Sequence, residues 1–180
     1  MKTLRTLSSI AFAATMVAFV TSAAVQQPAE TAGDSEVAHT LLTATELAIE
    51  HANLALETTE NERVLEYAET LLANNKTVNE NLGTFIEGTE TAPAPNKWSE
   101  KLMASTAEAE AELVELEGTA FDARFAETQA EFQQTLIDLL SESVIPDAET
   151  DELKTIATSL HSHAMELLRI SKDLVAPIEG

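Results

Sequence analysis

Apolar residues recur at three- and four-residue steps along almost the whole chain from residue 35 onward. That spacing places them on one face of an α-helix, and no stretch shows the two-residue alternation of a half-buried strand. Prolines, glycines and capping residues divide the pattern into segments. These predict helices over residues 35–58, 62–86, 99–117, 120–144 and 148–175. The spacing therefore predicts an all-α fold.

The lengths of the connections constrain how these helices pack. The first two helices and the last two are each joined by a short break, which favours antiparallel pairs. A long connection that holds the short third helix separates the pairs. We therefore expect a four-helix bundle with one long crossover that contains a short extra helix. The chain has no cysteine, so its hydrophobic core must hold it together.

The first 24 residues have the pattern of a secretory signal peptide. Lys2 and Arg5 precede an uncharged run that ends in the small residues Ser22, Ala23 and Ala24. We expect cleavage after Ala23 or Ala24 and export to the periplasm of a bacterium. An uncleaved membrane anchor is the alternative, but the run is short and rich in Ala, Ser and Thr for a spanning helix. No transmembrane segment is expected in the mature chain.

The expected domains follow from these boundaries: a signal peptide at 1–24, a flexible leader at 25–34 and one helical-bundle domain at 35–176. The chain is strongly acidic, with 31 Asp and Glu against 10 Lys and Arg and a formal net charge of −21. This charge argues against nucleic acid and anionic lipid as partners, since both are bound through Lys and Arg. A cationic partner stays open, and the charge also promotes solubility.

Several residues are typical of helix ends. Ser99 is a candidate N-cap for the third helix, with Trp98 packing on Met103 as a hydrophobic staple. Gly118 suits the end of that helix. Thr119 and Asp122 have the spacing of a capping box that would open the fourth helix.

Polar residues interrupt the apolar stripes at similar heights in the expected bundle. Asn75 lies 13 residues into its helix, and Gln133 lies 13 residues into a helix that starts at Ala120, about 20 Å from the same end. His163, Glu50 and His51 reach comparable heights. We therefore expect a mid-bundle polar cluster. It could be a hydrogen-bonded network that sets helix register, or a pocket for a ligand or metal.

Catalytic and metal-binding motifs are missing from the sequence. A di-iron bundle site needs two Glu-x-x-His units, and the chain has one, at Glu36 and His39. His161 and His163 are two residues apart and cannot chelate one ion from a helix. We expect no enzymatic activity, no metal and no cofactor.

Some segments resemble a bacterial family of unknown function. Residues 63–68, 71–75 and 79–82 are similar to the first half of this domain, whose members are labelled predicted outer-membrane or exported proteins in the ferritin-like group. Residues 116–125 resemble its Leu-x-Gly-x-x-Phe-Asp-x-x-Tyr signature, and residues 160–163 its closing histidine segment. The signature falls on Gly118, Phe121, Asp122 and Phe125.

The resemblance implies an exported, ferritin-like four-helix bundle, periplasmic or associated with the outer membrane. It also reveals departures from the family. The family has Asp-His late in the second helix and again in the next long helix, where this chain has Asn74-Asn75 and Phe132-Gln133. Only His163 matches a family histidine. A site built on those histidines would be largely lost here.

These observations favour a non-enzymatic exported protein, related to the envelope or to stress, that binds an unknown protein or small molecule. One alternative is a ferritin-like metal-handling protein with a degenerate mid-bundle site. Another is a structural bundle that self-associates through the wide apolar surface of residues 35–58.

Overall fold

The computed structural model describes residues 33–175, and this part contains helices and no strand. The all-α prediction is confirmed. The predicted signal peptide, and all of the predicted leader except Gly33 and Asp34, lie outside the described residues. The elements are α1 (Asp34–Thr58), α2 (Glu62–Thr89), α3 (Lys97–Leu113), α4 (Gly118–Leu139), η1 (Leu140–Val144), α5 (Ile145–Asp147) and α6 (Asp151–Val175).

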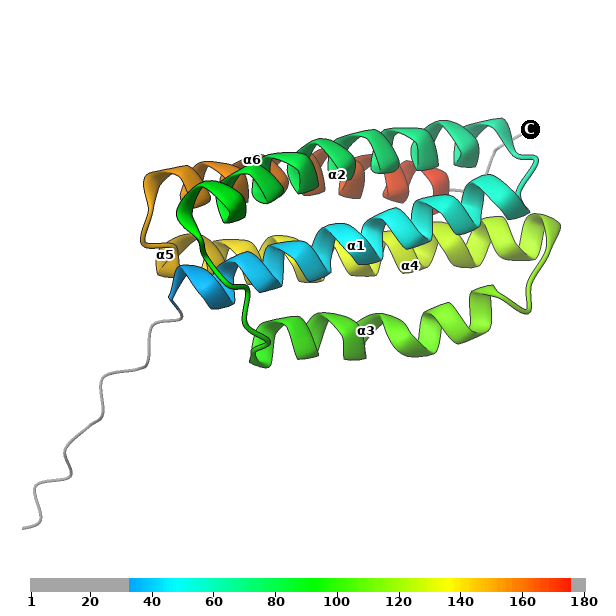
Figure 1. Cartoon of the computed structure of the whole chain (residues 1–180). Helices are drawn as coiled ribbons and strands as arrows, with labels where there is room; N and C mark the ends of the chain where they lie inside the picture. The colour runs from blue at the N-terminus through cyan, green and yellow to red at the C-terminus, as the bar shows by residue number, and fades with distance from the viewer. Residues whose placement is uncertain (1–32, 176–180) are drawn as a thin grey trace, which may run out of the picture. The chain divides into compact units, whose positions relative to one another are not determined.

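Four long helices form the bundle. α1 packs mainly on α2, α4 packs on α6, and α2 and α6 join the two pairs. α2 and α4 run in the same direction, opposite to α1 and α6, as the long crossover requires (Figure 1). α3 lies outside these four, against α1 and α4. The predicted bundle with one crossover and a short extra helix is therefore present.

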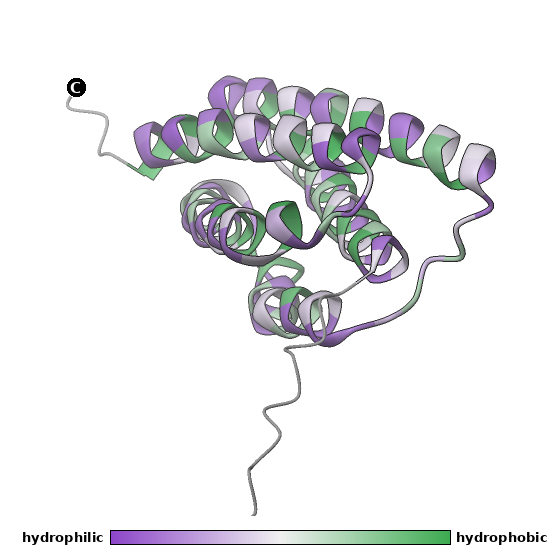
Figure 2. Ribbon diagram, turned by 90° about the vertical axis from the view of Figure 1, so that its left-hand side faces the viewer, coloured by the Kyte–Doolittle hydropathy of each residue, from purple (hydrophilic) through white to green (hydrophobic). Residues whose placement is uncertain are grey.

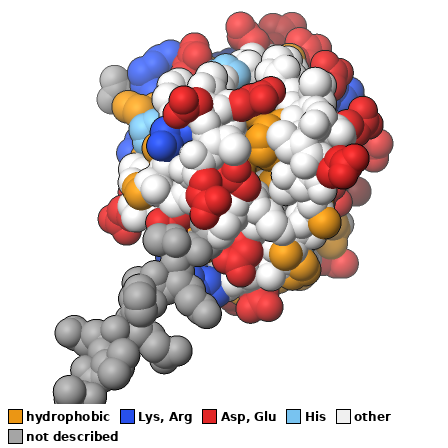
Figure 3. Space-filling view, turned by 60° about the vertical axis from the view of Figure 1, so that its left-hand side comes forward, with side chains coloured by type: hydrophobic (Ala, Val, Ile, Leu, Met, Phe, Trp, Pro, Cys, Tyr) orange, Lys and Arg blue, Asp and Glu red, His pale blue; other side chains and the backbone are white. Residues whose placement is uncertain are grey.

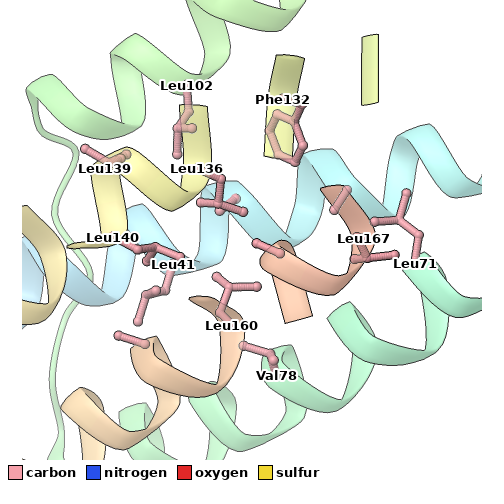
Figure 4. Close-up of a cluster of buried hydrophobic side chains, with 14 of the residues drawn as sticks. Leu41, Leu71, Val78, Leu102, Phe132, Leu136, Leu139, Leu140, Leu160 and Leu167 are labelled. Atoms are coloured by element: carbon pink, nitrogen blue, oxygen red, sulfur yellow. The ribbon is translucent and has the colours of Figure 1, made fainter. Parts of the chain in front are cut away.

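The hydropathic faces of the helices explain this packing. Apolar residues turn inward and polar residues outward along the helices (Figure 2). α1 contributes Val37 and Leu41 together with a row of buried alanines, whose small side chains let neighbouring helices approach closely. On the facing helices, Leu71 lies near Leu167, and Val78 lies near Leu160 (Figure 4). The buried alanines of α1 are Ala38, Ala44, Ala48, Ala52 and Ala55.

The start of α3 differs from the prediction. Asn96 is the N-cap, because its side chain accepts hydrogen bonds from the backbone N–H groups of Trp98 and Ser99. Ser99 closes a capping box by accepting from the Asn96 N–H. The predicted N-cap at Ser99 is therefore wrong by three residues. The predicted staple is also wrong, since Trp98 lies inside the helix and Met103 is exposed.

The α3–α4 connection also differs. Gly118 opens α4 with a φ of 57°, and the N-cap Glu117 makes no side-chain capping bond. The predicted capping box of Thr119 and Asp122 is wrong, because the helix has already begun before Thr119. The Asp122 carboxylate instead accepts hydrogen bonds from the side chains of Thr59 and Asn61 in the α1–α2 loop.

The end of α4 runs through η1, a π-helical turn, into the short α5, so α6 starts at Asp151 and not at residue 148. Asp34, the first residue of α1, accepts hydrogen bonds from the backbone of Glu149 and Thr150 just before α6. No helix in the described part is both long enough and apolar enough to cross a membrane. Acidic side chains are scattered over the visible face (Figure 3).

Candidate functional site

The structure places the predicted cluster residues at different depths. Asn75, Gln133 and His51 are buried, His163 is half-buried, and Glu50 is exposed. Glu50 therefore does not belong to an interior cluster. The reason is helical rotation: neighbouring residues differ by about 100° around the axis, so an inward His51 carries Glu50 onto an outer face.

His51 is one link of a hydrogen-bonded chain that crosses the bundle. Its Nε2 lies 3.0 Å from Oε1 of Glu110 on α3. Its Nδ1 lies 3.0 Å from Nε2 of Gln129 on α4. The Oε1 of Gln129 accepts from the hydroxyl of Tyr67 on α2, at 3.4 Å. One chain of contacts thus joins α1, α2, α3 and α4.

The donors and acceptors fix the tautomer of His51. The Tyr67 hydroxyl donates to Gln129 Oε1, so the Gln129 amide nitrogen faces His51 and donates to Nδ1. The imidazole proton is then on Nε2, where it donates to the Glu110 carboxylate. Every donor in the chain therefore points from Tyr67 toward Glu110, the only member with substantial exposure, at 35% of its side chain.

Burial shifts the pKa values of the two interior titratable groups. Desolvation lowers the pKa of His51 below 6.5, and the nearby carboxylates of Glu110 and Glu50 offset only part of this shift. Desolvation likewise raises the pKa of Tyr67. The Gln133 amide, which lies close to the Tyr67 hydroxyl but makes no hydrogen bond of normal geometry with it, opposes a smaller part of this shift. Both groups are therefore neutral near pH 7.

A second set of buried polar atoms, which do not belong to this hydrogen-bonded chain, has no hydrogen-bond partners. Among the described residues, Asn75 Oδ1, Gln133 Nε2 and His163 Nδ1 are buried atoms with no partner. The other side of the Asn75 amide is satisfied, since its Nδ2 donates to the backbone oxygen of Leu71. Unpaired buried polar atoms are rare, and they often indicate a bound water or ligand.

The packing of α2 on α6 places two of these residues at one level. Leu71 lies near Leu167 and Val78 lies near Leu160 (Figure 4). Asn75 lies between Leu71 and Val78 on α2. His163 lies between Leu160 and Leu167 on α6. Gln133 follows Gln129 by one turn on α4, which packs against α6. The unpaired atoms thus come from three helices in the middle of the bundle.

Sequence reasoning missed Gln129, Tyr67 and Glu110. Gln129 could have been found, because it lies in the α4 stripe one turn before Gln133. Tyr67 interrupts no apolar pattern, since its ring packs as a core residue, edge-on to Phe125 at 6.0 Å. Glu110 lies in the alternating Ala-Glu run of α3, where nothing distinguishes it from its acidic neighbours.

The family-signature positions lie at the end of the bundle near the α1–α2 loop. Phe121 and Phe125 are buried and stack with ring centroids 5.7 Å apart. Asp122 holds the α1–α2 loop, and Gly118 supplies the left-handed residue that opens α4. These contacts give the signature a structural role at this end of the bundle.

The arrangement provides few groups for chemistry on a metal. No group of three or more His, Asp or Glu side chains in the described part of the chain could hold a metal ion. The unpaired atoms belong to two amides and one imidazole, all without negative charge. Their chemistry is that of hydrogen-bond donors and acceptors.

The fold and the interior together define a class: an all-α protein with four long helices, a fifth helix packed on the side, and polar groups buried between them. Within this class, the chain belongs to a family described as a domain of unknown function (DUF4142), whose sequence model matches residues 11–174. No curated protein and no solved structure matches the chain. The expected membership in a family of unknown function is thereby confirmed.

Proposed function

We propose that this chain is an exported, non-enzymatic protein that binds a small polar guest inside its helical bundle. The observation that carries the proposal is the set of unpaired buried atoms Asn75 Oδ1, Gln133 Nε2 and His163 Nδ1. Leaving such atoms unpaired costs about 1–3 kcal/mol each, so a guest that pairs them gains that free energy on binding.

The chemistry of these atoms specifies the guest. Asn75 Oδ1 needs a donor, Gln133 Nε2 needs an acceptor, and His163 Nδ1 can take either role according to its tautomer. A guest with at least one donor and one acceptor and no net charge satisfies them, since an unpaired buried charge is far more costly than a dipole.

Export and a role in the cell envelope are part of the same proposal. They are supported by the pattern of residues 1–24. The resemblance of segments such as residues 116–125 to a family whose members are labelled outer-membrane and ferritin-like supports the same proposal.

A metal-handling protein with a degenerate site is the second candidate. One observation favours it: His163 Nδ1 is an imidazole nitrogen with no hydrogen-bond partner, and imidazole is a common metal ligand. The side-chain amides of Asn75 and Gln133 would be weak metal ligands beside this imidazole. The same experiment separates the two candidates.

The test is native mass spectrometry on protein recovered from the periplasm of cells that express the full chain. We expect extra mass on the folded ion, small and organic for a polar guest. Replacement of both Asn75 and Gln133 by Leu should remove this mass and keep the helical circular dichroism. A matched control is Asn74→Leu, the adjacent half-buried asparagine, which should keep the mass.

Other outcomes contradict parts of the proposal. Metal mass that is lost in His163→Leu would favour the second candidate. Bare ions from wild type, together with a loosened bundle in His163→Leu, would instead identify the polar residues as determinants of helix register.

A further inference from the structure

A small cavity lies between α3 and α4, apart from the unpaired atoms in the middle of the bundle. It has a volume of about 150 Å³ and is lined by Ser105, Thr106, Ala109, Thr128, Glu131, Phe132 and Thr135. The lining includes four hydroxyl groups and one carboxylate, and it includes no Lys, Arg or His side chain.

One residue that lines the cavity, Thr128, has a buried hydroxyl without a hydrogen-bond partner. Its side chain is 3% exposed, and its Oγ1 has no hydrogen-bond partner. A threonine hydroxyl on a helix often donates to the carbonyl four residues earlier, as Thr70 does in α2. Thr128 makes no such bond, so a residue that lines the cavity has a hydroxyl without a partner.

The hydroxyls on the α3 side have their protons already engaged. Ser105 donates to the backbone oxygen of Leu102 at 2.8 Å, and Thr106 donates to that of Met103 at 3.2 Å. Each hydroxyl oxygen keeps its lone pairs, so both residues can only accept from a ligand. The α3 wall therefore consists of hydrogen-bond acceptors.

Glu131 adds a negative charge to the same cavity. No ion pair in the described part of the chain involves Glu131, while Glu127, one turn earlier on α4, lies 3.8 Å from Arg124. Glu131 is exposed, and its charge also acts on Arg124 from a distance. A wall of acceptors that includes this carboxylate favours a ligand that has several N–H donors and one positive charge.

We propose that this cavity binds the ammonium group of a small alkylammonium ion. A primary ammonium has three N–H donors, enough for Glu131, one α3 hydroxyl and the Thr128 oxygen. The volume admits a few heavy atoms, and the alkyl chain contacts Phe132 and Ala109. The net charge of −21 also raises the local concentration of cations. This site goes beyond the interior site of the proposed function and does not depend on it.

The test is an NMR titration of the full chain with ethylammonium chloride at constant ionic strength. We expect saturable shifts that are largest at Thr106, Thr128 and Glu131. Glu131→Gln removes the charge and should weaken binding about tenfold or more. Thr128→Val, which keeps the shape and removes the hydroxyl, should weaken it several-fold.

Two probes and one variant serve as controls. Tetramethylammonium has the charge without N–H donors, and 1-propanol has similar size without charge, so both should bind at least tenfold more weakly. Glu127→Gln, on the same helix but outside the cavity, should bind as wild type does. The proposal is overturned if either probe binds as tightly as ethylammonium, or if Glu131→Gln leaves the affinity unchanged.

Discussion

His51 is a titratable side chain that the bundle buries in neutral form. Its Nδ1 accepts from Gln129 and its Nε2 donates to Glu110, so the neutral imidazole has both nitrogens satisfied. A second proton would sit on Nδ1, opposite the Gln129 amide donor, and would require that amide to rotate. The geometry and the desolvation therefore oppose protonation together.

The stability of the protein should consequently fall with acid in a way that depends on His51. Its folded pKa lies below the unfolded value of 6.5, so the unfolded chain takes up the proton first as the pH falls. The free energy of unfolding should decrease below pH 6.5, by about 1.4 kcal/mol for each unit of pKa difference. Urea unfolding of wild type and of His51→Gln across this pH range measures the effect. The free energy of unfolding of wild type should exceed that of His51→Gln by a smaller amount as the pH falls. An imidazole that titrates at or above 6.5 in the folded protein would contradict this.

The residues that the sequence could identify were breaks in an apolar stripe. Asn75, Gln133 and His51 were found in this way, and all three are buried. Their hydrogen-bond partners were not, because a partner depends on the rotation and height of a second helix. Glu110 illustrates this limit, since its contact with His51 exists only because α3 docks on α1 at that height.

The existence and order of the helices could be predicted from the sequence, whereas the residues at which they begin and end could not. The 3.6-residue pattern identified every long helix, since their stability comes from a buried face. The ends depend on local competition between capping groups. Asn96, and not Ser99, caps the start of α3. Asp34, which is distant in sequence, accepts a hydrogen bond from the backbone just before α6.

Two glycines allow one substitution to be tested in two backbone conformations. Gly118 has a φ of 57° and Gly83 lies inside α2, and an added Cβ would meet no atom within 4 Å at either position. Gly118→Ala should therefore destabilise the protein by about 1–2 kcal/mol through backbone strain alone. Gly83→Ala should stabilise it by about 0.5–1 kcal/mol through helix propensity. Thermal unfolding of the two variants checks the opposite signs; a stabilised Gly118→Ala would contradict the left-handed conformation.

At the scale of the whole molecule, the lengths of the loops predicted the topology, and the composition predicted the acidic charge. The short α1–α2 loop makes α1 and α2 antiparallel, and the long crossover from α2 to α4, which holds α3, allows α2 and α4 to run in the same direction. The place of α3 against both α1 and α4 could not be read from its sequence, because its Ala-Glu run offers little apolar surface.

The excess of acidic residues predicts a salt-dependent stability. Among 31 Asp and Glu and 10 Lys and Arg, repulsion dominates attraction in the folded state. The melting temperature should rise as sodium chloride is added up to about 1 M, where the screening length is about 3 Å. Differential scanning calorimetry at several salt concentrations measures this. A flat response would mean that the charges are too well spaced to interact.

The chain of contacts from Tyr67 to Glu110 also bears on how the protein assembles. Its four members lie on four helices, so any partly assembled bundle leaves some of these buried groups unpaired, at about 1–3 kcal/mol each. Partly folded forms are thereby penalised, and unfolding should be cooperative. Trp98, the only tryptophan, is buried on α3 and reports its docking. Its fluorescence and the far-ultraviolet circular dichroism should change at the same denaturant concentration, whereas an earlier fluorescence change would reveal α3 as an independently unfolding unit.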